Sequence, residues 1–192
     1  MFDIATQLYD ARDIRLGPID YEKDPAIESK WTHDAVFMRL FDVEPARPLS
    51  AALVKKQYEK LEKKMEESRD MFYFTIRARE DDRLIGKAEL RRIEWNNANC
   101  QLRLGIGAEA DRRKGYGTQT LHLLLRFVFA ELNMHRVTVN IPEYNTGALA
   151  LFRKFGFVEE VRRRKALERD GRRWDLFVFG LLQAEWLEQA KA

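Results

Sequence analysis

A short basic loop with two glycines, Arg112 to Thr118, lies between two segments of different hydrophobic period. Residues 100–107, before the loop, alternate between apolar and polar side chains, which predicts a β-strand. Residues 118–132, after it, are mostly apolar, keep their polar side chains on one stripe and contain neither Gly nor Pro, which predicts a helix. The predicted order is therefore strand, basic glycine loop, helix.

This order creates a site for a phosphate group. The first N–H groups of a helix have no partner inside the helix, and the helix dipole makes this end positive. Glycines let backbone amides approach a ligand closely, and Arg112, Arg113 and Lys114 add positive charge beside them. The loop therefore predicts binding of a phosphate or pyrophosphate.

Two common phosphate-binding loops do not fit. A P-loop requires Gly-Lys-Ser/Thr after four spacer residues, and a Rossmann turn requires a third glycine where this chain has Thr120. The pattern Arg112-x-x-Gly115-x-Gly117 resembles instead the acetyl-CoA pyrophosphate loop of the GNAT N-acetyltransferase superfamily, Gln/Arg-x-x-Gly-x-Gly/Ala. On the loop alone, an ordinary basic turn before a helix is an equally good interpretation.

A second motif follows at the spacing that this family has. Residues 136–141 alternate as the next strand, and Asn145 to Phe157 then resembles the family's closing segment, Asn-x-x-Ala-(x)3-Tyr-x-Lys-x-Gly-Phe. The wider similarity is to the branch that acetylates ribosomal-protein N-termini and to its diamine and general-amine relatives. It extends over most of the chain and includes residues 84–86, 99–107, 131–136 and 170–186.

The resemblance implies an α/β fold of the α+β type: the GNAT fold, with a mixed, mostly antiparallel central sheet that is splayed in the middle and flanked by helices. Because no linker rich in Pro, Gly or Ser divides the chain, residues 1–192 are expected to form a single compact, soluble N-acetyltransferase domain. In the family, the pantetheine arm lies in the splay and pairs with free strand amides. Gly105 and Gly107 are expected at a bulge there.

The loop and the resemblance together define the expected co-substrate site. We expect acetyl-CoA and no metal ion, because His33, His122 and His135 share no spacing typical of metal ligands. The residues expected to bind acetyl-CoA are Gly105, Ile106, Gly107, Arg112, Arg113, Lys114, Gly115, Tyr116, Gly117, Thr118, Asn145 and Phe152.

The implied chemistry is attack of an amine on the thioester carbonyl, and two substitutions leave its acid and base open. Many relatives have Tyr, the supposed thiolate acid, where this chain has Phe152, and many have Glu where it has Gln101. Tyr144, Tyr116 and Glu89 are the candidate replacements for these catalytic groups, although each is more simply interpreted as structural. Water could also act as the base. An α-amino group, with a pKa of about 8, needs less help than a lysine at about 10.4, which favours an N-terminal or similarly weakly basic acceptor.

Basic residues crowd a predicted hairpin near the end of the chain. Residues 158–167 and 174–182 are expected to pair about Asp170-Gly171, a favoured turn sequence. The arginines of this hairpin have two interpretations. They could place charge on an edge strand and so discourage pairing with another chain, or they could recognise an acidic acceptor or an RNA-bearing particle. In the resembled branch this hairpin lies near the acceptor, so Arg162 and Arg164 are the expected substrate-binding residues.

The remaining elements follow from periodicity and capping signals. A helix over 25–32 is expected to begin with Asp24 as N-cap, and a helix from about 51 to 69 with Ser50 as N-cap. The segment 37–48 contains two prolines and is expected to be irregular. Further strands are expected over 12–19, 72–79 and 84–93, and a terminal helix over 183–190.

The composition of the chain bears on its binding partners and on its cellular compartment. The net charge of +3, from 34 basic and 31 acidic residues, does not by itself favour a nucleic-acid partner. The chain has no long apolar run, so no membrane partner is expected, and no signal peptide is recognised. The single Cys100 in a strand pattern suggests a buried small side chain and a reducing compartment, which predicts a cytoplasmic protein. Formation of a homodimer stays open.

The sequence thus predicts acetyl-CoA-dependent transfer to a primary amine of a peptide or protein N-terminus or of a small molecule. Two alternatives stay open. Phe152 and Gln101 also fit a non-catalytic acetyl-CoA-binding sensor or interaction domain. The basic hairpin alone fits a nucleic-acid-binding module.

Overall fold

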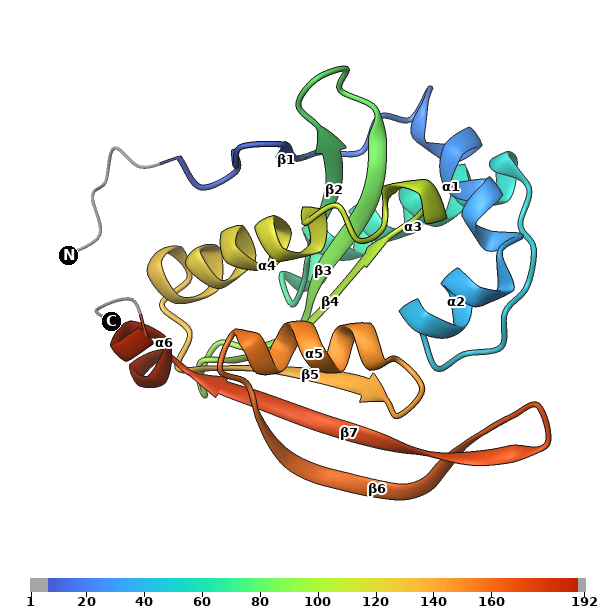
Figure 1. Cartoon of the computed structure of the whole chain (residues 1–192). Helices are drawn as coiled ribbons and strands as arrows, with labels where there is room; N and C mark the ends of the chain where they lie inside the picture. Colours follow the sequence, from blue (N-terminus) through green and yellow to red (C-terminus); the bar gives the residue numbers. More distant parts are fainter. Residues whose placement is uncertain (1–6, 190–192) are drawn as a thin grey trace.

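The computed structural model describes residues 7–189. Within this range, seven strands form one sheet in the order β1-β2-β3-β4-β5-β7-β6 (Figure 1). The strands are β1 Ile14–Gly17, β2 Phe72–Ala78, β3 Leu84–Glu94, β4 Asn99–Ile106, β5 Arg136–Pro142, β6 Val158–Arg169 and β7 Arg172–Leu182. The helices are α1 Asp24–Thr32, α2 Ala35–Phe41, α3 Ala51–Ser68, η1 Glu109–Asp111, α4 Tyr116–Arg126, the π-helical turn η2 Phe127–Glu131, α5 Thr146–Lys154 and α6 Gln183–Gln189.

The sheet opens between its two middle strands. All neighbouring strands pair antiparallel except β4 and β5, which are parallel and pair only from Asn99↔Arg136 to Gln101↔Thr138. Beyond Gln101, β4 pairs with β3 as far as Ile106 but has no β5 partner among the described residues. The expected fold, a mostly antiparallel sheet splayed in the middle, is therefore confirmed.

The two faces of the sheet differ in chemistry. Because side chains alternate along a strand, Phe72 and Phe74 of β2 contact Phe127 on one face, while Tyr73 packs with Tyr58 of α3 on the other. The first face holds the main apolar core, with α4 and α5 lying in front of the sheet in Figure 1. Cys100 is buried in this core, and burial raises its thiol pKa to about 12.

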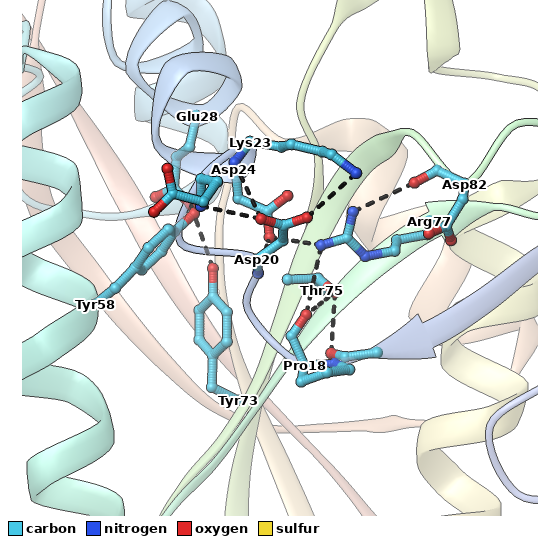
Figure 2. Close-up of polar contacts among 12 residues, drawn as sticks. Pro18, Asp20, Lys23, Asp24, Glu28, Tyr58, Tyr73, Thr75, Arg77 and Asp82 are labelled. Atoms are coloured by element: carbon cyan, nitrogen blue, oxygen red, sulfur yellow. Dashed lines mark hydrogen bonds and ion pairs between the residues drawn. The ribbon is translucent and has the colours of Figure 1, made fainter.

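The second face carries buried ionic contacts that hold α1 on the sheet (Figure 2). The Asp24 carboxylate accepts from the Arg77 guanidinium at 2.6 Å and from the Asp20 N–H at 2.7 Å. The Glu28 carboxylate accepts from the hydroxyl of Tyr58 at 2.6 Å, and a separate contact at 2.5 Å joins it to the Lys87 ammonium. Burial raises the pKa of Asp24 in spite of its partners.

Two expectations for the first third of the chain are wrong. Asp24 is the first residue of α1 rather than its N-cap, because its carboxylate is held by Arg77 on β2; the preceding Lys23 provides no side-chain cap. The segment expected to be irregular begins with α2, whose N-cap Asp34 accepts from the N–H groups of residues 36 and 37 at 2.9 and 3.1 Å.

The other local predictions hold with small shifts. Ser50 caps α3, and the hairpin turns at Asp170 and Gly171, which have φ values of 51° and 69°, as a two-residue turn with both φ positive requires. The long helix begins at Tyr116, two residues earlier than expected, and its last turn is π-helical. The terminal helix α6 ends at Gln189, and residue 190 lies outside the described range.

Candidate functional site

The opening between β4 and β5 leads into a cavity of about 370 Å³. Its walls come from the end of β4, the loop before α4, the start of α5 and the inner face of α2. Eight of the twelve residues predicted to bind acetyl-CoA line it: Gly105, Ile106, Arg112, Arg113, Gly115, Gly117, Thr118 and Asn145. The glycine loop and the sheet opening therefore belong to one site.

The glycine loop leaves the start of α4 open to this cavity. Gly115 is the N-cap residue at φ 84°, and no side chain among residues 7–189 caps the first amides of the helix. A Cβ on Gly117 would meet only the Leu151 Cδ2 atom, at 3.7 Å. Unpaired amides that face a cavity at the positive end of a helix are suited to an anionic ligand.

The predicted cations of the loop divide into three roles. Arg112 is a structural tie: its Nη2 donates to the Asp34 carboxylate at 2.9 Å and to the Gly107 carbonyl at 2.6 Å. Lys114 lies 3.8 Å from an Asp111 oxygen, and with Tyr116 it lines a different cavity of about 430 Å³. The exposed Arg113 lines the main cavity. Of the three charges, that of Arg113 is the most available to a ligand.

Gly105 and Gly107 have a different role from the expected bulge. The register between β3 and β4 runs without a shift through Lys87↔Gly105 to Gly86↔Ile106. A Cβ on Gly105 would lie 2.5 Å from Cδ2 of Phe41, and one on Gly107 would lie 2.0 Å from Cε2 of Trp31. The prediction of a bulge is wrong, since these glycines make room for aromatic rings of α1 and α2.

A second cavity of about 50 Å³ lies deeper between β4 and β5. Phe152 lines it, is 4% exposed and packs edge-on against Phe157, with 5.0 Å between ring centroids. Asn145 borders both cavities: its side chain accepts from the Ala148 N–H at 3.1 Å and donates to the Leu40 carbonyl at 2.9 Å. Asn145 therefore starts α5 and ties it to α2.

The catalytic candidates are engaged outside these two cavities. Glu89 is buried and accepts from Arg103 at 2.6 and 3.2 Å. Tyr144 donates its hydroxyl to the Arg39 carbonyl at 3.1 Å and lines a separate cavity of about 190 Å³; burial raises its pKa. Neither residue lines the sheet opening.

The two residues on β6 that are predicted to bind the acceptor substrate, Arg162 and Arg164, differ in their contacts. The Arg162 Nε atom donates to Asp175 at 2.5 Å, and the guanidinium lies 5.5 Å from the centre of the Phe177 ring. The backbone N–H of Lys165 and Arg162 both lower the pKa of Asp175. The Arg164 side chain is exposed and forms no hydrogen bond or ion pair within residues 7–189, although its charge helps to lower the pKa of Asp175. Arg162 therefore helps to hold the hairpin, and Arg164 is the freer charge.

Helix α2 contributes to the site, which the sequence did not predict. Phe37, Leu40 and Phe41 line the main cavity, and the ring of Phe41 lies 4.4 Å below the Arg103 guanidinium carbon. A signal was present, because Asp34 is a good N-cap and the residues at 37, 40 and 41 fall on one helical face.

A protein-family profile described as Acetyltransferase (GNAT) domain matches residues 13–158. The SPbeta prophage-derived uncharacterized N-acetyltransferase YokL of Bacillus subtilis is 28% identical over 118 residues, which cover 62% of this chain and 66% of that protein. The putative ribosomal N-acetyltransferase YdaF of the same organism is 29% identical, covering 55% and 57%. The spermidine N(1)-acetyltransferase of Vibrio cholerae is 27% identical, covering 56% and 62%. The chain thus spans less than two thirds of each of these relatives.

Solved structures share the fold over almost the whole chain. The spermidine N-acetyltransferase from Vibrio cholerae in complex with CoA and spermine has a TM-score of 0.78 and 21% identity, covering 91% of this chain and 98% of that one. A probable acetyltransferase has a TM-score of 0.81 at 19% identity, covering 94% and 98%. A dodecameric structure of the Vibrio cholerae enzyme has a TM-score of 0.74 at 21% identity, covering 93% and 98%. None of the described helices is long and apolar enough to cross a membrane.

Proposed function

The chain belongs to the GNAT acetyltransferase family, and from this premise we propose that it transfers the acetyl group of acetyl-CoA to a primary amine of a peptide or protein N-terminus or of a small molecule. The observation that carries the proposal is the cavity that joins the uncapped start of α4 to the opening between β4 and β5. Acetylated amine and free CoA thiol, formed in equal amounts, are the products to measure.

Acetyl-CoA would lie along this cavity in a defined direction. Its pyrophosphate would accept from the backbone N–H groups of residues 113–118, with Arg113 adding charge. Its pantetheine arm would pass Asn145 and pair with the part of β4 that has no β5 partner, residues 102–106. The thioester would then lie at the junction with the deeper cavity, where Phe152 would pack against the end of the arm.

The reaction in this site is direct transfer. The neutral amine forms a C–N bond to the acetyl carbonyl carbon, the C–S bond breaks, the amine loses a proton, and the thiolate gains one. Backbone N–H groups in the part of β4 without a β5 partner, residues 102–106, would polarise the carbonyl. A thiol has a pKa of about 8.5, so the thiolate leaves without a positioned acid. Water takes the role of base, since Gln101 cannot accept the proton.

Replacing Gly117 by valine is expected to weaken acetyl-CoA binding at least about tenfold, or 1.4 kcal/mol. The new side chain would occupy the space through which the pyrophosphate approaches the helix amides. Equilibrium titration with acetyl-CoA measures the effect. Thermal unfolding is the control, because a Cβ there meets only Leu151 at 3.7 Å, and the fold should tolerate it. An unchanged dissociation constant in a folded variant would show that the pyrophosphate lies elsewhere.

We also propose that the hairpin arginines face an acidic acceptor, and that Arg164 carries this contact because Arg162 is held by Asp175. Arg164→Glu is expected to raise the acceptor KM roughly threefold to tenfold at low ionic strength and to leave acetyl-CoA affinity unchanged. Lys60→Glu, on the exposed face of α3, is the matched charge reversal away from the hairpin. Equal effects of the two variants would make Arg164 part of the solvated surface.

A non-catalytic acetyl-CoA sensor is the second candidate. It is favoured by Phe152, which cannot donate a proton, and by Tyr144 and Glu89, whose polar atoms are engaged elsewhere. Tight acetyl-CoA binding without transfer to any acceptor would support it.

The proposal covers the whole chain, residues 1–192, as one acetyltransferase domain in the cytoplasm. The buried, unpaired Cys100 is compatible with a reducing compartment. Self-association into a homodimer or a larger assembly belongs to the same proposal and is supported by the dodecameric form of a structural neighbour. Light scattering at several protein concentrations measures it.

A further inference from the structure

One partly buried cation on the second face of the sheet lacks the carboxylate partner that its neighbours have. Arg77 pairs with Asp24 (Figure 2), and Lys87 pairs with Glu28. The guanidinium of Arg103 is bound by two carboxylates, those of residues 42 and 89.

Arg91, the next cation on this face, is held differently. Its Nε donates to the amide oxygen of Gln101 at 3.0 Å, and no carboxylate in residues 7–189 forms an ion pair with it. Gln101 lies directly opposite Arg91 in the β3–β4 register. The two terminal nitrogens of this guanidinium are therefore available to an external acceptor.

Of the two arginines that line the deeper cavity, Arg103 is already held by two carboxylates, whereas Arg91 is not. It is partly buried and lines the deeper cavity of about 50 Å³ together with Gln101, Asn145 and Phe152. This cavity shares five lining residues with the main cavity: Leu40, Phe41, Leu104, Asn145 and Ala148. An acceptor that attacks a thioester at the junction would have Arg91 beside it.

A bound anion would stabilise the positive charge of Arg91. Burial lowers the pKa of its guanidinium, and the charge of Arg103 lowers it further; Glu89 and Asp42 act in the opposite direction without offsetting both. Arginine still stays protonated in proteins. A carboxylate on the free guanidinium edge would offset the burial of this charge and would form two parallel hydrogen bonds.

Resting on the proposed function, we propose that the acceptor is an amine that also carries a carboxylate, and that Arg91 binds this carboxylate while the amine attacks the thioester. The size of the deeper cavity fits: about 50 Å³ is several times the roughly 10–15 Å³ that one water needs by the same measure, so a carboxylate group can enter it. A polyamine, by contrast, would bring further positive charge to Arg91. Two sources share the required chemistry, a free amino acid and a peptide with an acidic first residue.

Paired acceptors test the proposal, each pair differing in one carboxylate. The pairs are alanine with alaninamide, and an Asp-Ala amide peptide with its Asn-Ala counterpart; spermidine is the polycation. Wild type is expected to prefer the carboxylate member of one pair at least about tenfold in kcat/KM. The preferred pair identifies the source.

Arg91→Gln is expected to raise the KM for the preferred carboxylate acceptor about tenfold to a hundredfold. The KM values for its amide partner and for acetyl-CoA should change little. Arg92→Gln is the matched control, because Arg92 is the exposed neighbour on β3 and does not line the cavity. Gln101→Glu is an independent variant that keeps Arg91 and gives it an internal carboxylate, so it should also remove the preference.

The outcomes separate the two proposals. Transfer to all acceptors with no carboxylate preference, or equal losses for both members of a pair in Arg91→Gln, overturns the role of Arg91 and leaves the acetyltransferase intact. A preference that survives in Gln101→Glu also overturns it. Absence of transfer to every acceptor, with acetyl-CoA bound, overturns both.

Discussion

Replacing Arg77 by leucine is expected to lower the free energy of unfolding by about 3–5 kcal/mol at neutral pH. The Arg77 and Asp24 side chains are 6% and 0% exposed, and their contact at 2.6 Å joins β2 to the start of α1. Without the guanidinium, Asp24 would keep a buried charge whose Oδ1 atom already lacks a hydrogen-bond partner in residues 7–189. Removing one member of a buried ion pair costs more than removing both.

The loss of unfolding free energy in Arg77→Leu is expected to grow as the pH rises. Burial already raises the pKa of Asp24 in the folded protein, and loss of Arg77 raises it further. A raised folded-state pKa means that the native state binds more protons, so the variant is relatively most stable below the unfolded carboxyl pKa of about 3.9 and loses stability as pH rises through the folded value. Urea unfolding at pH 4.5 and 7.5 should give the larger deficit at pH 7.5.

The double variant Arg77→Leu with Asp24→Asn is the control. Asparagine keeps the acceptor for the Asp20 N–H but carries no charge, so it should recover a large part of the lost stability. A single variant that loses less than about 1 kcal/mol, or a double variant that is no more stable, would show that this pair does not hold α1 on the sheet.

Phe152→Tyr is expected to raise kcat roughly a hundredfold where thioester cleavage limits turnover, because it returns a proton donor to the thiolate. Phe152 lines the deeper cavity, and its ring already occupies the place where the donor is needed. Tyr144 does not fill that role, since its hydroxyl donates to the Arg39 carbonyl in a separate cavity. Single-turnover rates with a good acceptor isolate the chemical step.

Tyr144→Phe is the matched variant, since it removes a hydroxyl where the first change adds one. It is expected to leave the single-turnover rate within about twofold, in line with a side chain that takes no part in proton transfer. A slow Tyr144→Phe together with a neutral Phe152→Tyr would make Tyr144 the acid. A large loss in Phe152→Tyr alone would mean that the packing against Phe157 cannot admit the hydroxyl.

The parts of the fold that depend on neighbouring residues could be predicted from the sequence. The strand before Gly115, the helix after it and the turn at Asp170-Gly171 each follow from local periodicity or from a backbone conformation that only certain residues tolerate. Asn145 at the start of α5 is a local cap of the same kind. Most of the cavity wall consists of such elements, which is why most of the predicted cofactor residues line it.

The charges could not be assigned in the same way, because their partners are distant in sequence. Arg112 is predicted to face a phosphate, yet its partner Asp34 lies 78 positions away, at the N-cap of α2. This helix was not predicted, because two prolines follow it and the segment was expected to be irregular. Asp24 is a residue type favoured at helix N-caps, but Arg77, 53 positions away, binds its carboxylate. The free guanidinium of Arg91 is visible only once the strands are paired and its facing residue is known.

The measurement that tests the central claim most directly follows CoA thiol release and acetylated amine together, with acetyl-CoA and a panel of N-terminal peptides, amino acids and polyamines, in wild type and Gly117→Val. We expect equal amounts of the two products with at least one acceptor, and a higher acetyl-CoA KM in the folded variant. Acetyl-CoA that binds in the cavity beside Gly117 but is never consumed with any acceptor would overturn the proposed transfer and would make the protein a sensor of acetyl-CoA.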